Sequence, residues 1–218
     1  MKILAWNVER GKRGAAVLAE TTRQYNADII ILTETTKDID PGLPESIATT
    51  ELYKGYDGID YKAGENRTTI WSKYKIDRMV QTYDDYTSIC VEVGTPFGKL
   101  TVYGIIIGVF GGNGKASERY KSDLRNTDDV MKLPEQLCIA GDLNTTFSGW
   151  TYPSSEGRNA LNELFKQKNL VCLTCEIENS VNHIALSKSF IEGRNISIET
   201  WNHDKKLSDH IGVCVTIN

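Results

Sequence analysis

Short apolar runs that are followed at once by polar side chains recur along this sequence. The run at 137–140 leads into Gly-Asp-Leu-Asn, and the β-branched run at 27–32 leads toward Glu34. Such short runs are typical of buried strands, whereas apolar positions three and four apart, as between 15 and 25, indicate amphipathic helices. Residues 39–61, with several prolines and glycines, are expected to form a long connection. The pattern predicts strands at 2–6, 27–32, 67–72, 87–93, 99–107, 137–140, 181–187, 196–201 and 211–217, and helices at 15–25, 116–131 and 156–168.

The segment after the run at 137–140 places two chemically capable side chains close together. Gly141 is expected where the backbone leaves the sheet and a side chain would be crowded. Asp142 and Asn144 are two residues apart, so on an extended chain they share one face. A carboxylate beside a carboxamide can hold a hard cation, or orient a water or a phosphate oxygen. Aspartate and asparagine are also common in turns, so this segment alone does not distinguish a turn from a functional site. The residues at the ends of the other predicted strands are needed to make the distinction.

The composition is that of an ordinary globular chain. With 218 residues, 40% hydrophobic and 25% charged, we expect a single domain over residues 1–218. The formal net charge of -4 gives no overall basic signature of nucleic-acid binding, although a local basic rim would suffice. The apolar N-terminal run is interrupted at Glu9, too early for a signal peptide, and no apolar stretch approaches about 18 residues. We therefore expect no membrane span and a cytoplasmic monomer.

The five cysteines do not define a disulfide framework, because their number is odd and their positions are scattered. Reduced thiols in the cytoplasm are the simpler interpretation. Cys172 and Cys175 form a C-x-x-C pair that could be half of a zinc site or a redox pair. No second half follows at metal-ligand spacing, so a structural role is predicted. The glycine-rich stretch at 108–114 lacks the Lys-Ser/Thr of a phosphate-binding loop and is predicted to be a flexible turn.

Several predicted strands end in polar side chains that can perform chemistry. If these strands lie side by side, their ends converge on one cleft. Three or four carboxylates in one cleft repel one another unless a cation lies among them. Oxygen ligands favour Mg²⁺ or Mn²⁺ over zinc, and a histidine beside an aspartate adds an acid or base that works near neutral pH. Together these groups suit hydrolysis of a phosphate ester. They are Asn7 and Glu9, Glu34, Asp142 and Asn144, Asn182 and His183, and Asp209 and His210.

Four blocks, in this order, resemble the signature motifs of the endonuclease/exonuclease/phosphatase superfamily. They are 2–9 (KILAWNVE), 27–35 (ADIIILTET), 139–144 (IAGDLN) and 208–210 (SDH), with a weaker block at 67–74 (RTTIWSKY). The resemblance runs from residue 2 to the C-terminus. It implies an α/β fold, a four-layer αββα sandwich of two packed mixed β-sheets with helices outside. It also implies divalent-metal-dependent hydrolysis of phosphoester bonds, with Mg²⁺ or Mn²⁺ as the cofactor and the active site at one edge of the sandwich.

The resemblance further implies the residues that would hold the metal. Glu34 is the implied main ligand, helped by Glu9 or Asn7. Asp209 is the implied support of the metal cluster.

The catalytic roles follow from the same resemblance. Asp142 is implied to orient or deprotonate the attacking water, and Asn144 to position the phosphate or that aspartate. His210 is implied to contact the scissile phosphate or to act as the acid or base. Tyr103 falls where the abasic-site endonuclease branch places a phosphate-contacting tyrosine.

Two positions depart from the family pattern. The aspartate that commonly pairs with the final histidine is replaced by Asn182, which is expected to orient His210 by accepting a hydrogen bond. The second histidine of the pancreatic-type DNase branch is missing, because isoleucines occupy 105–107. His183, beside Asn182, is predicted to be a packed strand residue.

The substrate is the least determined part of this interpretation, because the fold alone does not fix it. A nuclease that cleaves phosphodiesters in DNA or RNA is the leading hypothesis. The alternatives are a small-molecule or lipid phosphatase or phosphodiesterase, and a catalytically weakened binding module. Aromatic residues in loops near the motifs could stack on bases, and basic residues could contact phosphates. These are Trp150, Tyr152 and Trp201, and Lys73, Arg158, Lys205 and Lys206.

Overall fold

The computed structural model describes residues 1–53, 59–108 and 116–218, and for residues 116–120 only the backbone. The turn expected at 108–114 therefore lies outside the described residues, except for Gly108. Within the described residues the strands form two six-stranded mixed sheets. The strand order of the first sheet is β11 (Ile196–Trp201), β12 (Gly212–Ile217), β1 (Lys2–Asn7), β2 (Ile29–Thr36), β4 (Glu65–Ser72), β3 (Glu45–Ala48). That of the second is β5 (Ile76–Val80), β6 (Ser88–Thr95), β7 (Gly98–Ile106), β8 (Leu137–Asp142), β10 (Asn182–Ser187), β9 (Leu170–Cys172).

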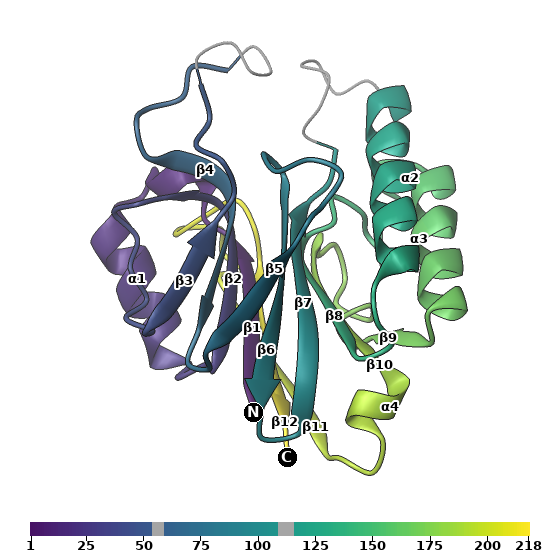
Figure 1. The fold of residues 1–218 in the computed structure, drawn as a ribbon. Coiled ribbons are helices and arrows are strands. Elements are labelled where there is room, and N and C mark those ends of the chain that lie inside the picture. The colour runs from purple at the N-terminus through teal and green to yellow at the C-terminus, as the bar shows by residue number, and fades with distance from the viewer. Residues whose placement is uncertain (54–58, 109–115) are drawn as a thin grey trace.

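The sheets pack face to face, and the long helices cover their outer faces (Figure 1). Helix α1 (Ala15–Gln24) lies on the first sheet, whereas α2 (Ala116–Lys132) and α3 (Ser155–Gln167) lie on the second. The short 3-10 helix η1 (Glu9–Gly11) follows β1, and α4 (Lys188–Ile191) follows β10. The layers confirm the predicted four-layer α/β sandwich. Among the described residues, no helix has both the length and the apolarity needed to cross a bilayer.

The alternation of side chains along the strands explains how one sheet fills two cores. In β1, Ile3 and Ala5 pack between the sheets, whereas Leu4 and Trp6 pack toward α1. Successive side chains of a strand point to opposite faces, so a strand buried on both faces is a continuous apolar run. The apolar run of β8 is buried in the same way, between the first sheet on one side and α2 and α3 on the other.

Strand pairing brings the polar strand ends to one edge of the sandwich. β1 is parallel to β2 and β7 is parallel to β8, so the C-terminal ends of each pair lie together. β10 is antiparallel to β8 and begins where β8 ends, with Asn182 opposite Asp142. Strand β12 is antiparallel to β1, with Val213 opposite Ala5, so the segment at 207–211 reaches the same edge. Across the core, β1 packs against β8 and β10, which places the polar ends of the two sheets side by side.

Gly141 lies where β7 approaches β8 too closely for a side chain. Its φ is +135°, and a Cβ at this position would lie 2.1 Å from the carbonyl oxygen of Ile105. Only glycine adopts this conformation without strain, and only glycine leaves room for the neighbouring strand. This confirms the expectation from the sequence, and it fixes the direction in which Asp142 leaves the sheet.

Three short strands were not predicted, namely β3, β5 and β9. Each lies at an edge of its sheet, and β3 lies within the region predicted as a connection. In β5 the side chains are exposed or half-buried, including Met79, which is 59% exposed. An edge strand pairs on one side only and is often short and polar, so its sequence carries little apolar periodicity.

Candidate active site

Asn7 joins carboxylates from the two sheets. Its Nδ2 donates to Asp142 Oδ2 at 2.9 Å and to Glu34 Oε1 at 3.3 Å. Asn7 and Asp142 are buried, and the Glu34 carboxylate is 23% exposed at the mouth of the cluster. The backbone N–H of Glu9 donates to Asn7 Oδ1 at 2.9 Å, which fixes the orientation of the amide. Three strand ends that are far apart in sequence therefore form one polar cluster.

Asp142 is the most deeply buried carboxylate of this cluster. Burial raises the pKa of Asp142, and the opposing effects of His210 and of hydrogen bonds from Asn7 and Asn144 only partly offset it. The Asn144 backbone N–H donates to Asp142 Oδ1 at 2.9 Å, and its side-chain Nδ2 donates to the Ile107 carbonyl at 2.6 Å. Asn144 thus holds Asp142 in place through its own backbone, while its amide is anchored on Ile107, the residue that follows β7.

His210 is held by the loop that precedes β12. Ser208 is fully buried, and its hydroxyl donates to the Asn7 carbonyl at 2.7 Å, so the loop is tied to β1. The backbone N–H of His210 donates to Ser208 Oγ at 3.2 Å. His210 Nδ1 lies 3.9 Å from Asp142 Oδ2, and Nε2 lies 3.4 Å from Asp209 Oδ1.

Asn182 orients His210 by donating, not by accepting as the sequence analysis expected. Its Nδ2 donates to the Ile211 carbonyl at 3.2 Å and lies 3.2 Å from His210 Nδ1. A carbonyl can only accept, so it fixes which amide atom faces the imidazole. His210 Nδ1 is then an acceptor, and the proton of the neutral ring is on Nε2. Asn182 Oδ1 is buried and has no hydrogen-bond partner among the described residues.

Four of the nine non-glycine residues with left-handed φ in the described part of the chain lie in or beside the cluster. Glu9, Arg10, Glu34 and Asn144 all have left-handed φ values, of 51°, 55°, 46° and 45°. Non-glycine residues in this region cost about 1–3 kcal/mol each and gather at functional sites. The strain points to a function for these residues that folding alone does not require.

Two arginines and a tyrosine surround Glu34, and the sequence analysis assigned them no role. Arg67 lies between Asn66 and Thr68, which pair with Thr35 and Thr33, so it faces Glu34 across the ladder. Arg67 and Arg10 each approach a different Glu34 oxygen at 3.8 Å. The Tyr61 ring contacts both guanidinium groups, at 5.0 Å from Arg67 and 5.7 Å from Arg10. The feature of the sequence that could have indicated this contact is Arg67, a basic residue near the start of the strand that pairs with the strand of Glu34.

The donor set fits Mg²⁺ better than zinc. In the described part of the chain, no three His, Cys, Asp or Glu side chains lie close enough to enclose a metal. The Glu34 and Asp142 carboxylates offer oxygen ligands, and Mg²⁺ commonly binds one or two carboxylates while keeping several waters. Asn7 turns its Nδ2 toward both carboxylates, and its Oδ1 accepts from the Glu9 N–H. Glu9 lies behind them, with Oε1 bound to Lys12 and Oε2 buried without a hydrogen-bond partner among the described residues.

Three of the sequence-predicted residues lie apart from this cluster. Tyr103 is fully buried among the apolar residues beneath α2 and α3, and its hydroxyl donates to Asp129 at 3.0 Å. It faces the helices because the next residue, Gly104, faces the first sheet. The Asp209 carboxylate is 65% exposed and lies 3.4 Å from His210 Nε2. His183 is packed as predicted between the carbonyls of Thr145 and Ser180; burial lowers the pKa of His183 to about 4.

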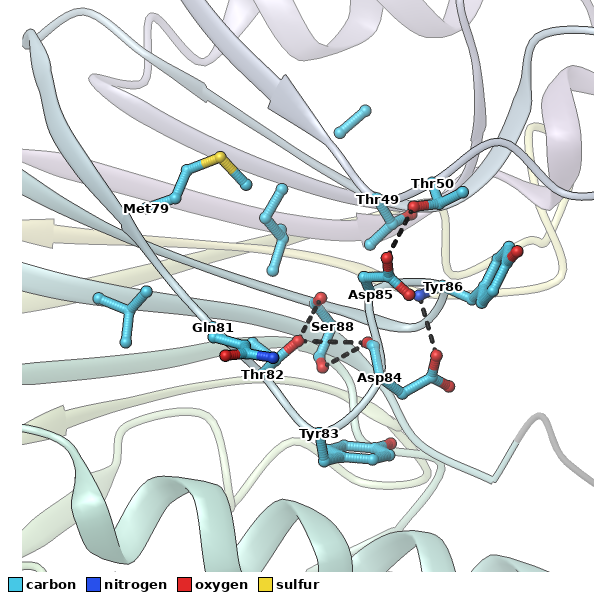
Figure 2. Close-up of a pocket in the computed structure, with 13 residues that line it drawn as sticks. Thr49, Thr50, Met79, Gln81, Thr82, Tyr83, Asp84, Asp85, Tyr86 and Ser88 are labelled. Atoms are coloured by element: carbon cyan, nitrogen blue, oxygen red, sulfur yellow. Dashed lines mark hydrogen bonds between the residues drawn. The ribbon is translucent and has the colours of Figure 1, made fainter.

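A separate cavity of about 690 Å³ lies between the end of β3 and the connection from β5 to β6 (Figure 2). The Thr50 hydroxyl donates to Asp85 at 3.2 Å, and the Tyr86 backbone N–H donates to Asp84 at 3.0 Å (Figure 2). None of the cluster residues lines this cavity. The cavity is therefore separate from the candidate site around Asn7.

Comparison with known proteins agrees with this architecture. The model of the Endonuclease/Exonuclease/phosphatase family matches residues 4–210, so the chain belongs to this family. This confirms the resemblance found in the sequence and places the protein in a class of phosphoester hydrolases.

Solved structures share the fold at low sequence identity. An AP endonuclease from Archaeoglobus fulgidus is 12% identical with a TM-score of 0.71, covering 100% of this chain and 99% of that chain. The 3'-5' exonuclease NExo from Neisseria meningitidis is 15% identical with a TM-score of 0.73, covering 100% of both chains. Beta toxin from Staphylococcus aureus, solved with bound magnesium ions, is 13% identical with a TM-score of 0.65, covering 100% and 99%. A search of curated proteins finds no match.

Proposed function

We propose that this protein is a nuclease that hydrolyses phosphodiesters in DNA or RNA with the help of Mg²⁺ or Mn²⁺. The observation that carries the proposal is the Asn7 amide, which joins the carboxylates of Glu34 and Asp142 from opposite sheets. His210 lies beside this pair, 3.9 Å from Asp142. A base, a cation ligand and a hydrogen-bond donor thus lie side by side at one edge of the sandwich.

Asp142 acts as the base that takes the proton from the attacking water. Burial raises the pKa of this carboxyl, which makes the carboxylate a stronger base. The Asn144 N–H and the Asn7 amide hold both of its oxygens in place. Ordered groups need no reorganisation when the transition state forms, which is how a preorganised site lowers the barrier.

His210 binds a phosphoryl oxygen through its Nε2–H. Asn182 donates to Nδ1, so even the neutral imidazole presents a donor outward. Asn182 stands where the family pattern would place an aspartate, and its Nδ2 lies 3.2 Å from His210 Nδ1.

Glu34 would hold the metal, and Asn7 would orient this carboxylate through its Nδ2, with Glu9 behind them. When bound, the cation would neutralise negative charge on the phosphoryl oxygens and on the departing oxygen. Arg10 and Arg67, each 3.8 Å from Glu34, add fixed positive charge for substrate phosphates. They also keep Glu34 paired before the cation and the substrate arrive.

Trp150 favours a nucleic acid over a smaller substrate. Its side chain is 83% exposed, yet its backbone is fixed on both sides. Its N–H donates to Asn179 Oδ1 at 3.0 Å, and its carbonyl accepts from Arg158 at 3.2 Å and from the Thr146 hydroxyl. An exposed indole on a backbone that is held at both its N–H and its carbonyl is suited to stacking on a base. Trp201, in contrast, is buried and stacked on Tyr25, at a ring distance of 4.2 Å, so it has no such role.

The second candidate is a small phosphoester. It is favoured by the net charge of -4, since the chain as a whole does not attract a polyanion. It shares the proposed catalytic residues and differs only in the substrate. A binding module without activity is disfavoured by the buried, raised-pKa carboxylate of Asp142 and the strained backbone of Glu34.

The test is nicking of supercoiled plasmid DNA with Mg²⁺ or Mn²⁺, with EDTA as the blank. Asp142→Asn should reduce nicking by at least about 100-fold, the usual scale of a lost general base. Asp129→Asn is the matched control, because Asp129 binds the buried Tyr103 hydroxyl away from the cluster. Metal-dependent nicking that survives in the Asp142 variant would refute the assigned base. No nicking, with hydrolysis of a phosphomonoester instead, would favour the second candidate.

A further inference from the structure

The C-x-x-C pair, for which the sequence predicts a structural role, is arranged for disulfide formation. Cys172 ends β9, and Cys175 follows in a turn that is closed by a hydrogen bond from the Cys175 N–H to the Cys172 carbonyl at 3.4 Å. Such a turn brings the two Cα atoms within about 7 Å. Disulfides span Cα distances of about 4.4–6.8 Å, a range that is compatible with such a turn.

The two thiols are not equivalent. The neighbouring Cys172 thiol lowers the pKa of Cys175 to about 7, against the raising effects of burial and of Glu176, whose Oε1 accepts from Cys175 Sγ at 3.7 Å. The interaction with Cys175, together with burial, raises the pKa of Cys172. Cys175 is therefore the nucleophilic thiol, and Cys172 is the resolving thiol.

The other three cysteines provide an internal comparison. Cys90, Cys138 and Cys214 are buried in the cores, whereas Cys172 and Cys175 are half-buried. Burial raises the pKa of each of the three thiols to about 12, so they remain protonated and unreactive. Only the pair in the turn combines access to solvent with a stabilised thiolate.

We propose that Cys172 and Cys175 are a reversible oxidation site that reacts with a hydroperoxide. The Cys175 thiolate attacks the peroxide, so that an S–O bond forms, the O–O bond breaks and hydroxide leaves. Cys172 then attacks the sulfenic sulfur; an S–S bond forms, the S–O bond breaks, and the oxygen leaves as water with the thiol proton. Two thiols are oxidised to one disulfide while one hydrogen peroxide is reduced to two waters, and a dithiol reverses the change.

The position of the turn gives this site a connection to the cluster, although the proposal does not depend on the proposed hydrolysis. Thr174, between the two cysteines, contacts His183 Nδ1 at 3.1 Å and accepts from the Ile184 N–H at 3.0 Å. Both partners lie in β10, which begins with Asn182 and thereby supports His210. The oxidised turn would thus be attached directly to the strand behind the candidate active site.

The test is oxidation of the reduced full-length protein with a small excess of hydrogen peroxide, followed by alkylation in denaturant and peptide mapping. A disulfide between Cys172 and Cys175 should form first, while Cys90, Cys138 and Cys214 remain alkylatable. Before oxidation, a limiting alkylating reagent at pH 7 should label Cys175 about sixfold faster than an ordinary exposed thiol. At pH 7 the thiolate fraction of Cys175 is about 50-fold higher than that of an ordinary thiol, but this advantage is partly offset because a less basic thiolate is a weaker nucleophile.

Two variants distinguish the roles of the thiols. Cys172→Ser should stop the reaction at a sulfenic acid on Cys175, which a cyclic diketone traps, and Cys175→Ser should leave Cys172 reduced. Circular dichroism confirms that each variant is folded. Oxidation of Cys172 in the Cys175→Ser variant at the wild-type rate would overturn the proposal. So would a wild-type protein in which this pair oxidises no faster than the three buried cysteines.

Discussion

Replacing Gly141 with alanine should destabilise the protein strongly, because the strand that carries Asp142 has no room for a methyl group. The new Cβ would lie 2.1 Å from the Ile105 carbonyl oxygen, and Ile105 pairs with Gly141 in the parallel ladder. Relief of the clash must move one strand against the other. An overpacked site costs about 1–3 kcal/mol, and a positive φ on a non-glycine residue a further 1–3 kcal/mol. We expect a total loss of about 4 kcal/mol.

The assay is thermal unfolding followed by circular dichroism. For a domain of this size, about 4 kcal/mol corresponds to a fall in Tm of about 8–16 °C. The matched control is Gly94→Ala, since no atom lies within 4 Å of a Cβ at that position. This control should change the stability by less than about 1 kcal/mol. Equal melting temperatures for the two variants would refute the close approach of β7 and β8.

Four further predictions concern the site. Mg²⁺ should raise the Tm of the wild-type protein, and Glu34→Gln should abolish this rise, because a ligand stabilises only the state that binds it; an unchanged rise would remove Glu34 from the metal site. Burial raises the pKa of Asp142, so this group takes up a proton at a higher pH than an ordinary aspartate does. Because the deprotonated carboxylate is needed as the base, kcat should fall when the pH is lowered through that raised pKa. A rate that stays flat down to about pH 4 would contradict this, since an ordinary aspartate ionises near there. Trp150→Ala should weaken DNA binding about tenfold, the scale of one lost stacking contact, whereas Tyr53→Ala, at a 57% exposed aromatic, should not. In ¹⁵N NMR the neutral imidazole of His210 should carry its proton on Nε2, and a proton on Nδ1 would contradict the donor role of the neighbouring amide.

The sequence was sufficient to predict the two buried strands that deliver Glu34 and Asp142, because both strands are continuous apolar runs with abrupt polar ends. Gly141 could be interpreted for the same reason, since glycine at such a boundary has few other uses. The order of the blocks then indicated the family, and with it the layers of the fold. These features are local in the chain, which is why they can be predicted without coordinates.

The remaining features depend on register and orientation, which are not local. Arg67 reaches Glu34 only because β4 pairs with β2 in one particular register. Tyr103 faces the helices because side chains alternate between the two faces of β7, and a shift of one residue would have turned it to the other face. The donor role of Asn182 is set by the Ile211 carbonyl, a backbone group from another strand region.

The central claim is that this cluster hydrolyses phosphoesters with a divalent cation, whatever the natural substrate is. The most direct measurement is hydrolysis of bis(p-nitrophenyl) phosphate with Mg²⁺ or Mn²⁺, because this diester needs no base recognition. We predict metal-dependent release of p-nitrophenol that EDTA abolishes, that Asp142→Asn reduces at least about 100-fold, and that Asp129→Asn retains. Release that persists in EDTA, or that is equal in the Asp142 variant and the wild type, would contradict the account.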